Sequence, residues 1–490
     1  MIKYAMASTA PDLSQTQDTD ASERLSLKTK LAFGAGDIAG GITATIRSFS
    51  LLVFLTEVAG LGAGLAGGVV LIGRVWDAIN DPLVGYLSDR TRSRWGRRHV
   101  WMLWGSVPLG ITFALIWIVP PFEQTWALFT YYVVMSLLFD TAYTAVNLPY
   151  MSLTPELTRD YDERTRLNSV RFAFSIGGSI LALILGFVIA SIFSGAGEQT
   201  TQYLVLGVIC AVLSVLPIYW CVWGTEERYD GEPQERLPAL QEWTTIFSNR
   251  PFLLVIGVYL CSWLAFQLTA GVIPYYVTVW MQQDQYFLVA LVVQTVAFSM
   301  LFVWSRLSDR IGKRAIYGLG IGLWLIAQVG LFFLPRDLVW LMYALSVLAG
   351  CGVSVVYLVP WSLLPDVIEL DELRTGRRRE GMFYSLMSLL QKVGVGIALF
   401  LVGQFLSWSG FIERAAEQPG VTQPDSALLA IRTLAGPLPG VILLVGIVLT
   451  YYYPISRAVH DKIRRQLQRR LRRQSRQRAK ADLTNAKAYD

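Results

Sequence analysis

The chain has 490 residues, of which 53% are hydrophobic and 16% are charged, and its formal net charge is +6. A soluble protein would carry about 25% charged residues, and long apolar stretches recur here from residue 30 to residue 456. The composition excludes a soluble globular protein and predicts an all-α polytopic membrane protein rather than a membrane barrel. The positive charge lies in short loops and in the C-terminal tail, where membrane topology explains it, so we expect no nucleic acid partner.

Twelve membrane spans follow a polar N-terminal tail that lacks the apolar core of a signal peptide. Each span is near the ~20 residues that cross a bilayer, and together they cover residues 31–56, 65–88, 100–119, 126–150, 169–193, 202–223, 252–280, 286–306, 315–334, 338–364, 382–408 and 428–453. The predicted organisation is a tail (1–30), a six-helix half (31–224), a linker (225–250), a second six-helix half (251–455) and a basic tail (456–490).

The loops predict the orientation of the chain. Arginine and lysine gather in residues 89–98, 309–314 and 374–379, whereas the opposite connections, 59–64, 120–125, 194–201 and 282–285, nearly lack them. By the positive-inside rule both termini are cytoplasmic. We therefore expect a monomeric multi-pass protein of the plasma membrane, which in a bacterium is the inner membrane.

Two motifs recur from the first half to the second. Leu87–Arg90 (LSDR) returns as Leu307–Arg310, 220 positions later, and Ser152–Glu156 (SLTPE) returns as Ser362–Asp366 (SLLPD), 210 positions later. Two parallel six-helix halves of this kind enclose a substrate site between them and alternate its access from one side to the other.

The C-terminal tail allows two interpretations, and the cysteines and histidines indicate no catalytic or metal site. Ile463, Leu467 and Leu471 are spaced by four residues, which fits either an amphipathic helix on the anionic leaflet or a solvated tail that fixes topology. The four cysteines lie in apolar stretches without metal spacing, and both histidines lie near membrane edges. We therefore expect neither an enzyme nor a cofactor.

The second span carries a polar face whose burial in the membrane costs much free energy. Asp77, Asn80 and Asp81 share one helical face, and Arg74 lies one turn before them. A charge at this depth costs at least ~2.5–3.5 kcal/mol. The oxygens suit Na⁺, with Asp77 and Asp81 as the charged ligands, whereas H⁺ would bind one buried carboxylate. The alternative is a static ion-pair network such as Asp77 with Arg74.

Other spans carry isolated polar groups. The fourth span has Asp140, Tyr143, Thr144 and Asn147 at helical spacing, which suits either cation and substrate binding or interhelical hydrogen bonds. The first span has Asp37 and Arg47, and the fifth has Arg171.

A lysine, Lys392, lies deep in the eleventh span. It needs a carboxylate partner, and the pair in the second span is the obvious candidate. The lysine either competes with the cation, as a coupling device, or forms a static salt bridge.

Charged loops between the spans are predicted to act in gating and helix-end packing. The candidate gating residues are Asp89, Arg90, Arg94, Arg97, Asp309 and Arg310. A second loop, with Asp366, Glu369, Asp371, Glu372 and Arg377–Arg379, is predicted to pair with the other half when the cytoplasmic side closes.

Several of these motifs resemble one known family. Residues 74–82 (RVWDAINDP) and 91–97 (TRSRWGR) resemble the signature of the glycoside–pentoside–hexuronide:cation symporters, the family of melibiose permease within the major facilitator superfamily. The motifs at Gly34–Asp37, Asn147–Glu156 and Gln391–Lys392 also fall where that family has its motifs, and the pattern extends over all the spans.

The resemblance implies roles for individual residues. Asp77, Asn80, Asp81 and Thr144 match the family's cation ligands; Asp37, Tyr143 and Arg171 match sugar-contacting positions; and Lys392 matches a lysine near both sites. The galactoside pocket of melibiose permease is not reproduced. Asn147 occupies the position of an acidic sugar ligand in that protein. Met151 and Tyr357 occupy positions where it has tryptophans, and Gly36 a position where it has a lysine. Arg47 and Asp140 are added charges. We place Asn147, Tyr357 and Arg47 with the substrate residues.

These observations predict a secondary transporter with the major facilitator fold that couples Na⁺ or H⁺ to symport of a glycoside, pentoside or hexuronide. The lost carboxylate and the added arginine favour an anionic substrate such as a uronate or sulfonated sugar. One alternative is a lysolipid or other amphiphile as cargo, with import or export, since lysophospholipid symporters related to this family keep the carboxylates of the second span. Another is a non-transporting sensor or scaffold, whose buried charges would all be paired.

Overall fold

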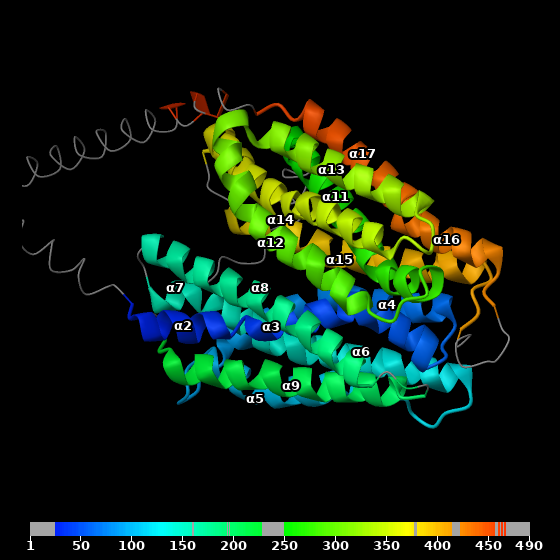
Figure 1. The fold of residues 1–490 in the computed structure, drawn as a ribbon. Coiled ribbons are helices and arrows are strands. Elements are labelled where there is room, and N and C mark those ends of the chain that lie inside the picture. The colour runs from blue at the N-terminus through cyan, green and yellow to red at the C-terminus, as the bar shows by residue number, and fades with distance from the viewer. Residues whose placement is uncertain are drawn as a thin grey trace, which may run out of the picture.

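The computed structural model describes residues 25–158, 161–193, 195, 197–227, 249–376, 380–413 and 422–455, with 459–460, 462–463 and 465–466. Over these residues the chain consists of helices and the turns between them (Figure 1), which confirms the all-α prediction. Most of the predicted N-terminal tail, most of the linker 225–250, Arg377–Arg379, and Leu467 and Leu471 of the predicted tail helix lie outside the described residues.

The first half of the chain contains α2 (Leu27–Ala35), α3 (Ile38–Ile46), the π-helical segments η1 (Arg47–Leu51) and η2 (Phe54–Val58), α4 (Ala63–Arg90), α5 (His99–Ile116), α6 (Thr125–Ser152), α7 (Thr154–Leu157), α8 (Tyr161–Ile192) and α9 (Gln199–Gly224). The second half contains α11 (Arg250–Tyr275), the π-helical segment η3 (Tyr276–Trp280), α12 (Tyr286–Ile311), α13 (Lys313–Phe333), α14 (Val339–Thr375), α15 (Glu380–Trp408), α16 (Asp425–Ala435) and α17 (Pro437–Tyr452). Each of the twelve predicted spans falls on one of these helices or on consecutive helical segments.

Nine helical stretches among the described residues are long and apolar enough to cross a membrane. The other predicted spans correspond to the segmented first helix, to α4 and to α6. The first helix is divided into short segments, and α4 and α6 carry the carboxylates Asp77, Asp81 and Asp140 within their apolar stretches.

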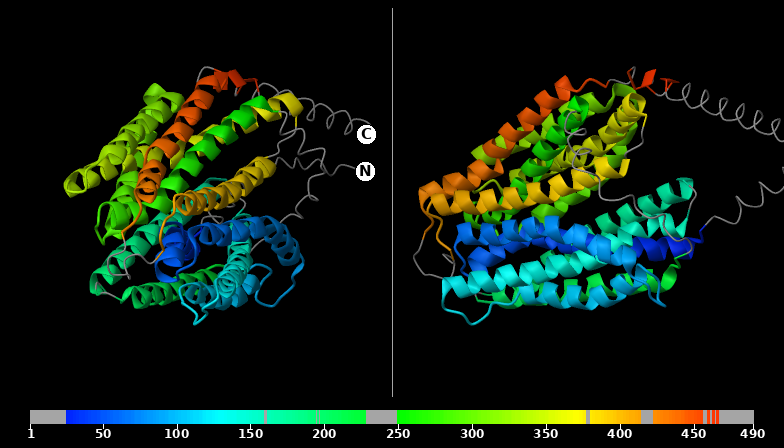
Figure 2. Two further views of the ribbon diagram at one scale, coloured as in Figure 1. Left: turned by 90° about the vertical axis from the view of Figure 1, so that its right-hand side faces the viewer. Right: turned by 180° about the vertical axis from the view of Figure 1, so that it is seen from behind.

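The two halves form two layers, with α2–α9 in one and α11–α17 in the other (Figures 1 and 2). We call the end of the molecule at which the first and last described residues lie the terminal end, and the opposite end the distal end. The layers come together at the distal end and diverge toward the terminal end (Figure 1). One hydrophobic core extends through the first half into the distal parts of α11, α12 and α15, and a second core lies within the second half.

Helices α4 and α15 make the longest contact between the halves, and glycines make it close. A Cβ on Gly67 would lie 3.0 Å from the Cα of Phe400, and a Cβ on Gly396 would lie 2.8 Å from the Cβ of Arg74. Small residues allow helix backbones to approach in this way. The contact brings the polar face of α4 against a helix of the other half.

The first helix breaks between α2 and α3, at Gly36 and Asp37. A Cβ on Gly36 would lie 2.5 Å from the Tyr150 ring, so α6 leaves no room for a side chain there. The Tyr150 hydroxyl donates a hydrogen bond of 2.8 Å to the Phe33 carbonyl near the break. The break puts Asp37 at the start of α3 and buries it.

Candidate functional site

The polar face of α4 is buried between the halves. Asp77 and Asn80 are each 2% exposed, while the Asp81 side chain is 28% exposed. Arg74 Nη1 lies 3.3 Å from Asp77 Oδ2, so the ion pair weighed as an alternative from the sequence is present. Asp77 Oδ1 is buried and has no hydrogen-bond partner among the described residues. This oxygen is therefore a buried acceptor that the described residues leave unsatisfied.

A lysine from the other half completes this face. Lys392 Nζ on α15 lies 2.6 Å from Asp81 Oδ2 and 3.9 Å from Asp77 Oδ2. Thr144 on α6 donates a hydrogen bond of 3.0 Å to Asp81 Oδ1. Four of the sequence-predicted residues therefore meet at one point, where an ammonium group lies between two carboxylates.

A second buried ion pair adjoins this face. Arg47 of η1 lies against Asp140 of α6, with 2.5 Å between Nη1 and Oδ1, and the two residues are 4% and 1% exposed. The guanidinium also lies 4.6 Å from the centroid of the Phe139 ring. A Cβ on Gly73 would lie 2.6 Å from Asp140 Oδ2, so a glycine on α4 makes room for this carboxylate. Arg47, predicted as a substrate ligand, is thus paired in this conformation.

Asn80 is tied to the same part of α6. Its amide nitrogen donates to the backbone carbonyl of Asp140 at 3.4 Å. Trp76 on the neighbouring face donates to Thr141 Oγ1 at 2.9 Å. Contacts with α6 therefore fix the orientation of the α4 face around Asp77.

The predicted substrate residues divide into two groups. Arg171 Nε lies 3.7 Å from Asp37 Oδ2, and a Cβ on Gly40 would lie 3.1 Å from Asp37 Oδ1 and 3.2 Å from the Tyr143 hydroxyl, so these side chains share one region. Asn147 is half-buried on α6, one turn beyond Tyr143. Tyr357 lies in the second half, where its hydroxyl is 3.5 Å from Gln294 Oε1 and its ring packs against those of Trp263 and Phe266.

The charges in this cluster balance. The four carboxylates have four cationic partners in the pairs Asp37–Arg171, Asp77–Arg74, Asp81–Lys392 and Asp140–Arg47. Seven of these eight residues belong to the first half, and Lys392 alone comes from the second. Each carboxylate of the cluster is therefore compensated by a cationic side chain in this conformation.

The predicted gating residues lie at the terminal end, where Asp89 and Arg97 pair with residues of their own half. Asp89 Oδ1 is 2.5 Å from Arg98 Nη2, and both Arg97 and Arg98 donate to Glu156 Oε1, at 2.6 and 3.0 Å. The guanidinium of Arg90 covers the Tyr86 ring, that of Arg94 covers the Trp95 ring, and Arg310 is exposed. The Asp309 side chain lies outside the described part of the chain.

Ion pairing also shifts the pKa of one arginine in this network. Partial burial lowers the pKa of Arg97, but the hydrogen bond and charge of Glu156 outweigh burial, so the pKa is raised. The guanidinium therefore stays charged, and the network holds the loop before α5 against α7.

The second half also has an ion pair between a basic residue and the acidic residue of the repeated motif. Lys313 Nζ lies 2.9 and 2.8 Å from the two carboxylate oxygens of Asp366, in the second copy of the repeated motif. His460 Nε2 lies 3.5 Å from Asp366 and 3.1 Å from Glu369. Two residues of the loop predicted to pair across the halves, Asp366 and Glu369, are therefore paired within the second half in this conformation.

Glu227 is a structural residue that the sequence did not indicate. Its carboxylate accepts hydrogen bonds from the backbone N–H groups of Arg97, Arg98 and His99, at 2.7, 2.8 and 2.9 Å. These are free donors at the start of α5, where a negative charge is favoured. No local motif marks Glu227, because its partners lie about 130 residues away.

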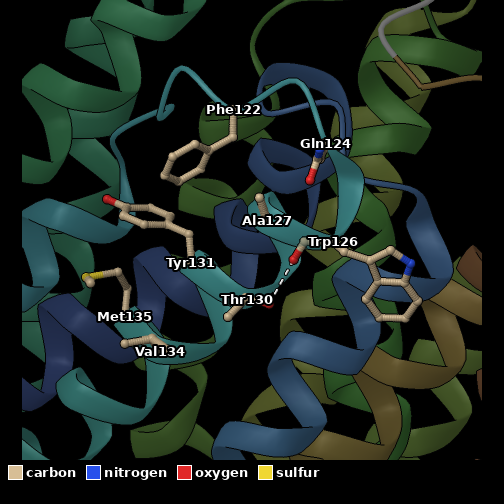
Figure 3. A pocket seen from close by; sticks show the side chains of 8 residues that line it. All are labelled: Phe122, Gln124, Trp126, Ala127, Thr130, Tyr131, Val134 and Met135. Atoms are coloured by element: carbon tan, nitrogen blue, oxygen red, sulfur yellow. Dashed lines mark hydrogen bonds between the residues drawn. The ribbon is translucent and has the colours of Figure 1, made fainter.

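The described residues form no group of three or more His, Cys, Asp or Glu side chains arranged for a metal ion. A hollow of about 550 Å³ lies elsewhere, at the start of α6, and apolar and aromatic side chains such as Phe122, Trp126 and Tyr131 line it (Figure 3). Trp126 is 69% exposed, which is typical of an aromatic belt at a membrane interface. The hollow has no charged lining residue, so it is separate from the charged cluster.

Comparison with known proteins gives one family over nearly the whole chain. Residues 32–457 match the family described as MFS/sugar transport protein. An uncharacterized symporter of Synechocystis sp. is 45% identical over 92% of this chain and 98% of its own length. A putative glycoside/cation symporter of Escherichia coli is 28% identical over 91% of this chain and 95% of its own. A sodium-dependent lysophosphatidylcholine symporter of Danio rerio is 27% identical over 91% and 89%.

Solved structures agree on the fold. A bacterial homolog of the human lysosomal transporter Spinster superposes with a TM-score of 0.64 at 12% identity, covering 89% of this chain and 97% of that one. At this identity the similarity concerns the fold alone, and it agrees with the predicted major facilitator arrangement.

Proposed function

Since the chain belongs to the MFS/sugar transport protein family, whose members are transporters rather than enzymes, we propose that it is a Na⁺- or H⁺-coupled symporter of a sugar or sugar acid. The Escherichia coli relative named as a putative glycoside/cation symporter supports this assignment. The observation that carries it is the position of Lys392, whose ammonium group lies between Asp77 and Asp81.

The transported cation takes the place of this ammonium. Na⁺ at that point would meet carboxylate oxygens of Asp77 and Asp81, with Thr144 and Asn80 beside them, which are the hard ligands it prefers. Alternatively, H⁺ would neutralise one of the two carboxylates. In either case the ammonium group of Lys392 no longer holds α15 to α4.

Release of Lys392 then changes the relation between the halves. A ligand shifts a conformational equilibrium only through its different affinity for the two states. The cation favours the state in which Lys392 has left the carboxylates, and the substrate stabilises that state through Asp37, Tyr143, Asn147, Arg171 and the freed lysine. Rocking of the halves then moves both ligands across the membrane.

The charge balance favours an anionic substrate. The cluster is neutral before loading, and one monovalent cation makes it +1. A uronate or a sulfonated sugar restores neutrality, which matters because unpaired charge in the membrane interior is costly. We therefore expect a uronate to compete for the site better than the neutral sugar of the same stereochemistry.

The test is uptake of labelled glycosides, pentosides and uronates into proteoliposomes under a Na⁺ gradient, a pH gradient or neither. Uptake that depends on one gradient supports the proposal, and Asp81→Asn should reduce it to background. Lys392→Ala should bind the cation more tightly, because the competing charge is gone, while losing gradient-driven accumulation. The matched control is Lys313→Ala, which removes a lysine–aspartate pair outside the cluster. Unchanged cation affinity in Lys392→Ala would contradict the exchange mechanism.

A lysolipid or other amphiphile is the second candidate cargo, and the relative from Danio rerio supports it. Inclusion of a labelled lysophospholipid in the same assay distinguishes the two. A complete absence of flux would favour the third possibility, a sensor or scaffold.

We also propose that both termini face the cytoplasm of a bacterial cell, that the halves are bounded at residues 31–224 and 251–455, and that the protein acts as a monomer. The arginine-rich loops at the terminal end support the orientation.

A further inference from the structure

Hydroxyl groups join the two halves at the distal end. Thr56 Oγ1 of η2 lies 2.7 Å from the Tyr275 hydroxyl of α11. The Tyr286 hydroxyl of α12 lies 3.1 Å from Ser50 Oγ of η1 and 3.0 Å from the Tyr203 hydroxyl of α9. In each pair one partner belongs to the first half and the other to the second.

These pairs are sealed from solvent. Thr56, Ser50 and Tyr275 are 0% exposed, and Tyr286 and Tyr203 are 4% and 5% exposed. A buried hydroxyl that loses its partner carries the full cost of desolvation. Separation of the distal ends therefore breaks the buried hydrogen bonds of Tyr275 and Tyr286.

A carboxylate joins the halves at the same end. Glu413, which follows α15, accepts a hydrogen bond of 2.8 Å from the backbone N–H of Ala63, the first residue of α4. Gln404 on α15 donates to the Gly64 carbonyl at 3.2 Å. A negative charge at a helix N-terminus is stabilising. Glu413 thus caps the helix that carries Asp77 and Asp81, but it does so from the opposite half.

The helices that supply the hydroxyl pairs are irregular at this end. Ser50 and Thr56 lie in the π-helical segments η1 and η2, and Tyr275 directly precedes η3. Segments η2 and η3 begin 222 positions apart, close to the spacing of the internal repeat. Short π-helical segments are rare and frequently mark functional sites. Both halves therefore have an irregular helix end beside the buried hydroxyl pairs.

We propose that Glu413 and the hydroxyl pairs of Tyr275 and Tyr286 form a gate, called here the distal gate, which closes the transport path at the end remote from the termini. The proposal rests on the alternating access described above. The two ends differ in kind: the charged networks described at the terminal end pair within one half, whereas the distal gate pairs across the halves.

The gate and the charged cluster share one helix pair. Ala63 and Asp81 lie about 27 Å apart along α4 at 1.5 Å per residue. Lys392 of α15 contacts α4 at Asp81, and Glu413, in the segment after α15, contacts it at Ala63. A cation that releases Lys392 therefore leaves α4 held to α15 chiefly through glycine contacts and the distal cap. Opening of the distal end then requires loss of that cap.

The first test is Tyr286→Phe, which keeps the ring and its stacking on Phe287 but removes both cross-half hydrogen bonds. The matched control is Tyr276→Phe, which removes a buried tyrosine hydrogen bond to Leu331 within the second half. Spin labels at Gln124→Cys and Asp337→Cys report the distal separation, and labels at Arg92→Cys and Arg310→Cys report the terminal separation, with the four native cysteines replaced.

We expect Tyr286→Phe to increase the ratio of distally open to distally closed molecules by about threefold to tenfold, the effect of losing hydrogen bonds. The terminal distance should shorten in the same molecules. Tyr275→Phe should act in the same direction. Distance distributions that match those of Tyr276→Phe would overturn the gate.

The second test is Glu413→Gln, paired with Glu198→Gln, whose carboxylate accepts a hydrogen bond from the backbone N–H of Gly195 in its own loop. Glu413→Gln should favour the distally open state and tighten binding of substrate added from the distal side, because the binding-competent fraction rises. If the distal distances and the substrate affinity are the same in the two variants, Glu413 is not part of the gate. These distances need no transport assay, so a shift without cation-driven uptake would refute the proposed function and leave the gate standing.

Discussion

The two halves of the molecule differ in what they place near the middle of their helices. In the described chain, the first half contributes all four carboxylates and three of the four cationic side chains of the charged cluster, and the second half contributes Lys392. At the terminal end the halves match instead, with Glu156 bound to Arg97 and Arg98 in one and Asp366 bound to Lys313 in the other. Both halves therefore have ion pairs that hold helix ends, and they differ at the charged cluster.

The largest expected effect is the loss of stability on breaking the buried Arg47–Asp140 ion pair, which belongs to the first half. Asp140→Leu leaves the Arg47 guanidinium buried without its carboxylate, which should cost about 3–5 kcal/mol of stability. Arg47→Met should cost a similar amount for the converse reason. Thermal unfolding of the purified protein measures both changes.

The double variant Arg47→Met/Asp140→Leu is the control for this prediction. Because an apolar pair of similar volume often replaces a buried ion pair at little cost, we expect it to recover most of the lost stability. Additive losses in the double variant would mean that each charge has a separate partner.

The loops that follow the repeated LSDR motif in the two halves should differ in stability by a smaller amount. Gly96 and Gly312 both have positive φ, at 96° and 87°. A Cβ on Gly96 would lie 2.5 Å from Glu227 Oε1, whereas a Cβ on Gly312 would have nothing within 4 Å. Alanine should cost about 1–3 kcal/mol of backbone strain at either site, and Gly96→Ala should lose a further ~1 kcal/mol because the cap on α5 is displaced.

Thermal unfolding of the two alanine variants and of Glu227→Gln measures this difference. Equal stability of Gly96→Ala and Gly312→Ala would show that Glu227 contributes nothing to the first loop.

The helices and the α4 face follow from the sequence for simple reasons. Apolar stretches long enough to span a bilayer must be helical, because no water is present to satisfy the backbone. Helical spacing put Asp77, Asn80 and Asp81 on one face, and an intramembrane lysine needs a carboxylate, which pointed to the contact that Lys392 makes.

The remaining contacts depend on tertiary structure. Arg47 and Asp140 were visible as added charges, but they are 93 positions apart and no local signal pairs them. Glu227 and Glu413 cap helices that lie far away in the chain. The loop around Asp366 was expected to pair with the other half when the cytoplasmic side closes; here the halves diverge at that end (Figure 1), and Asp366 pairs with Lys313 of its own half.

The smallest expected effect concerns the contribution of α6 to the cation site. Thr144→Val removes the hydroxyl that bonds to Asp81, and Thr144→Ser keeps it. If this oxygen also binds the cation, Thr144→Val should weaken cation binding by about threefold to tenfold, the effect of one lost ligand contact, while Thr144→Ser stays near the wild type. Thr141→Val is the matched control, because the Thr141 hydroxyl meets Trp76 rather than a carboxylate. Cation titrations of the purified variants decide the matter: an equal loss in Thr141→Val would reflect altered helix packing, and an unchanged Thr144→Val would confine the site to the carboxylates of α4.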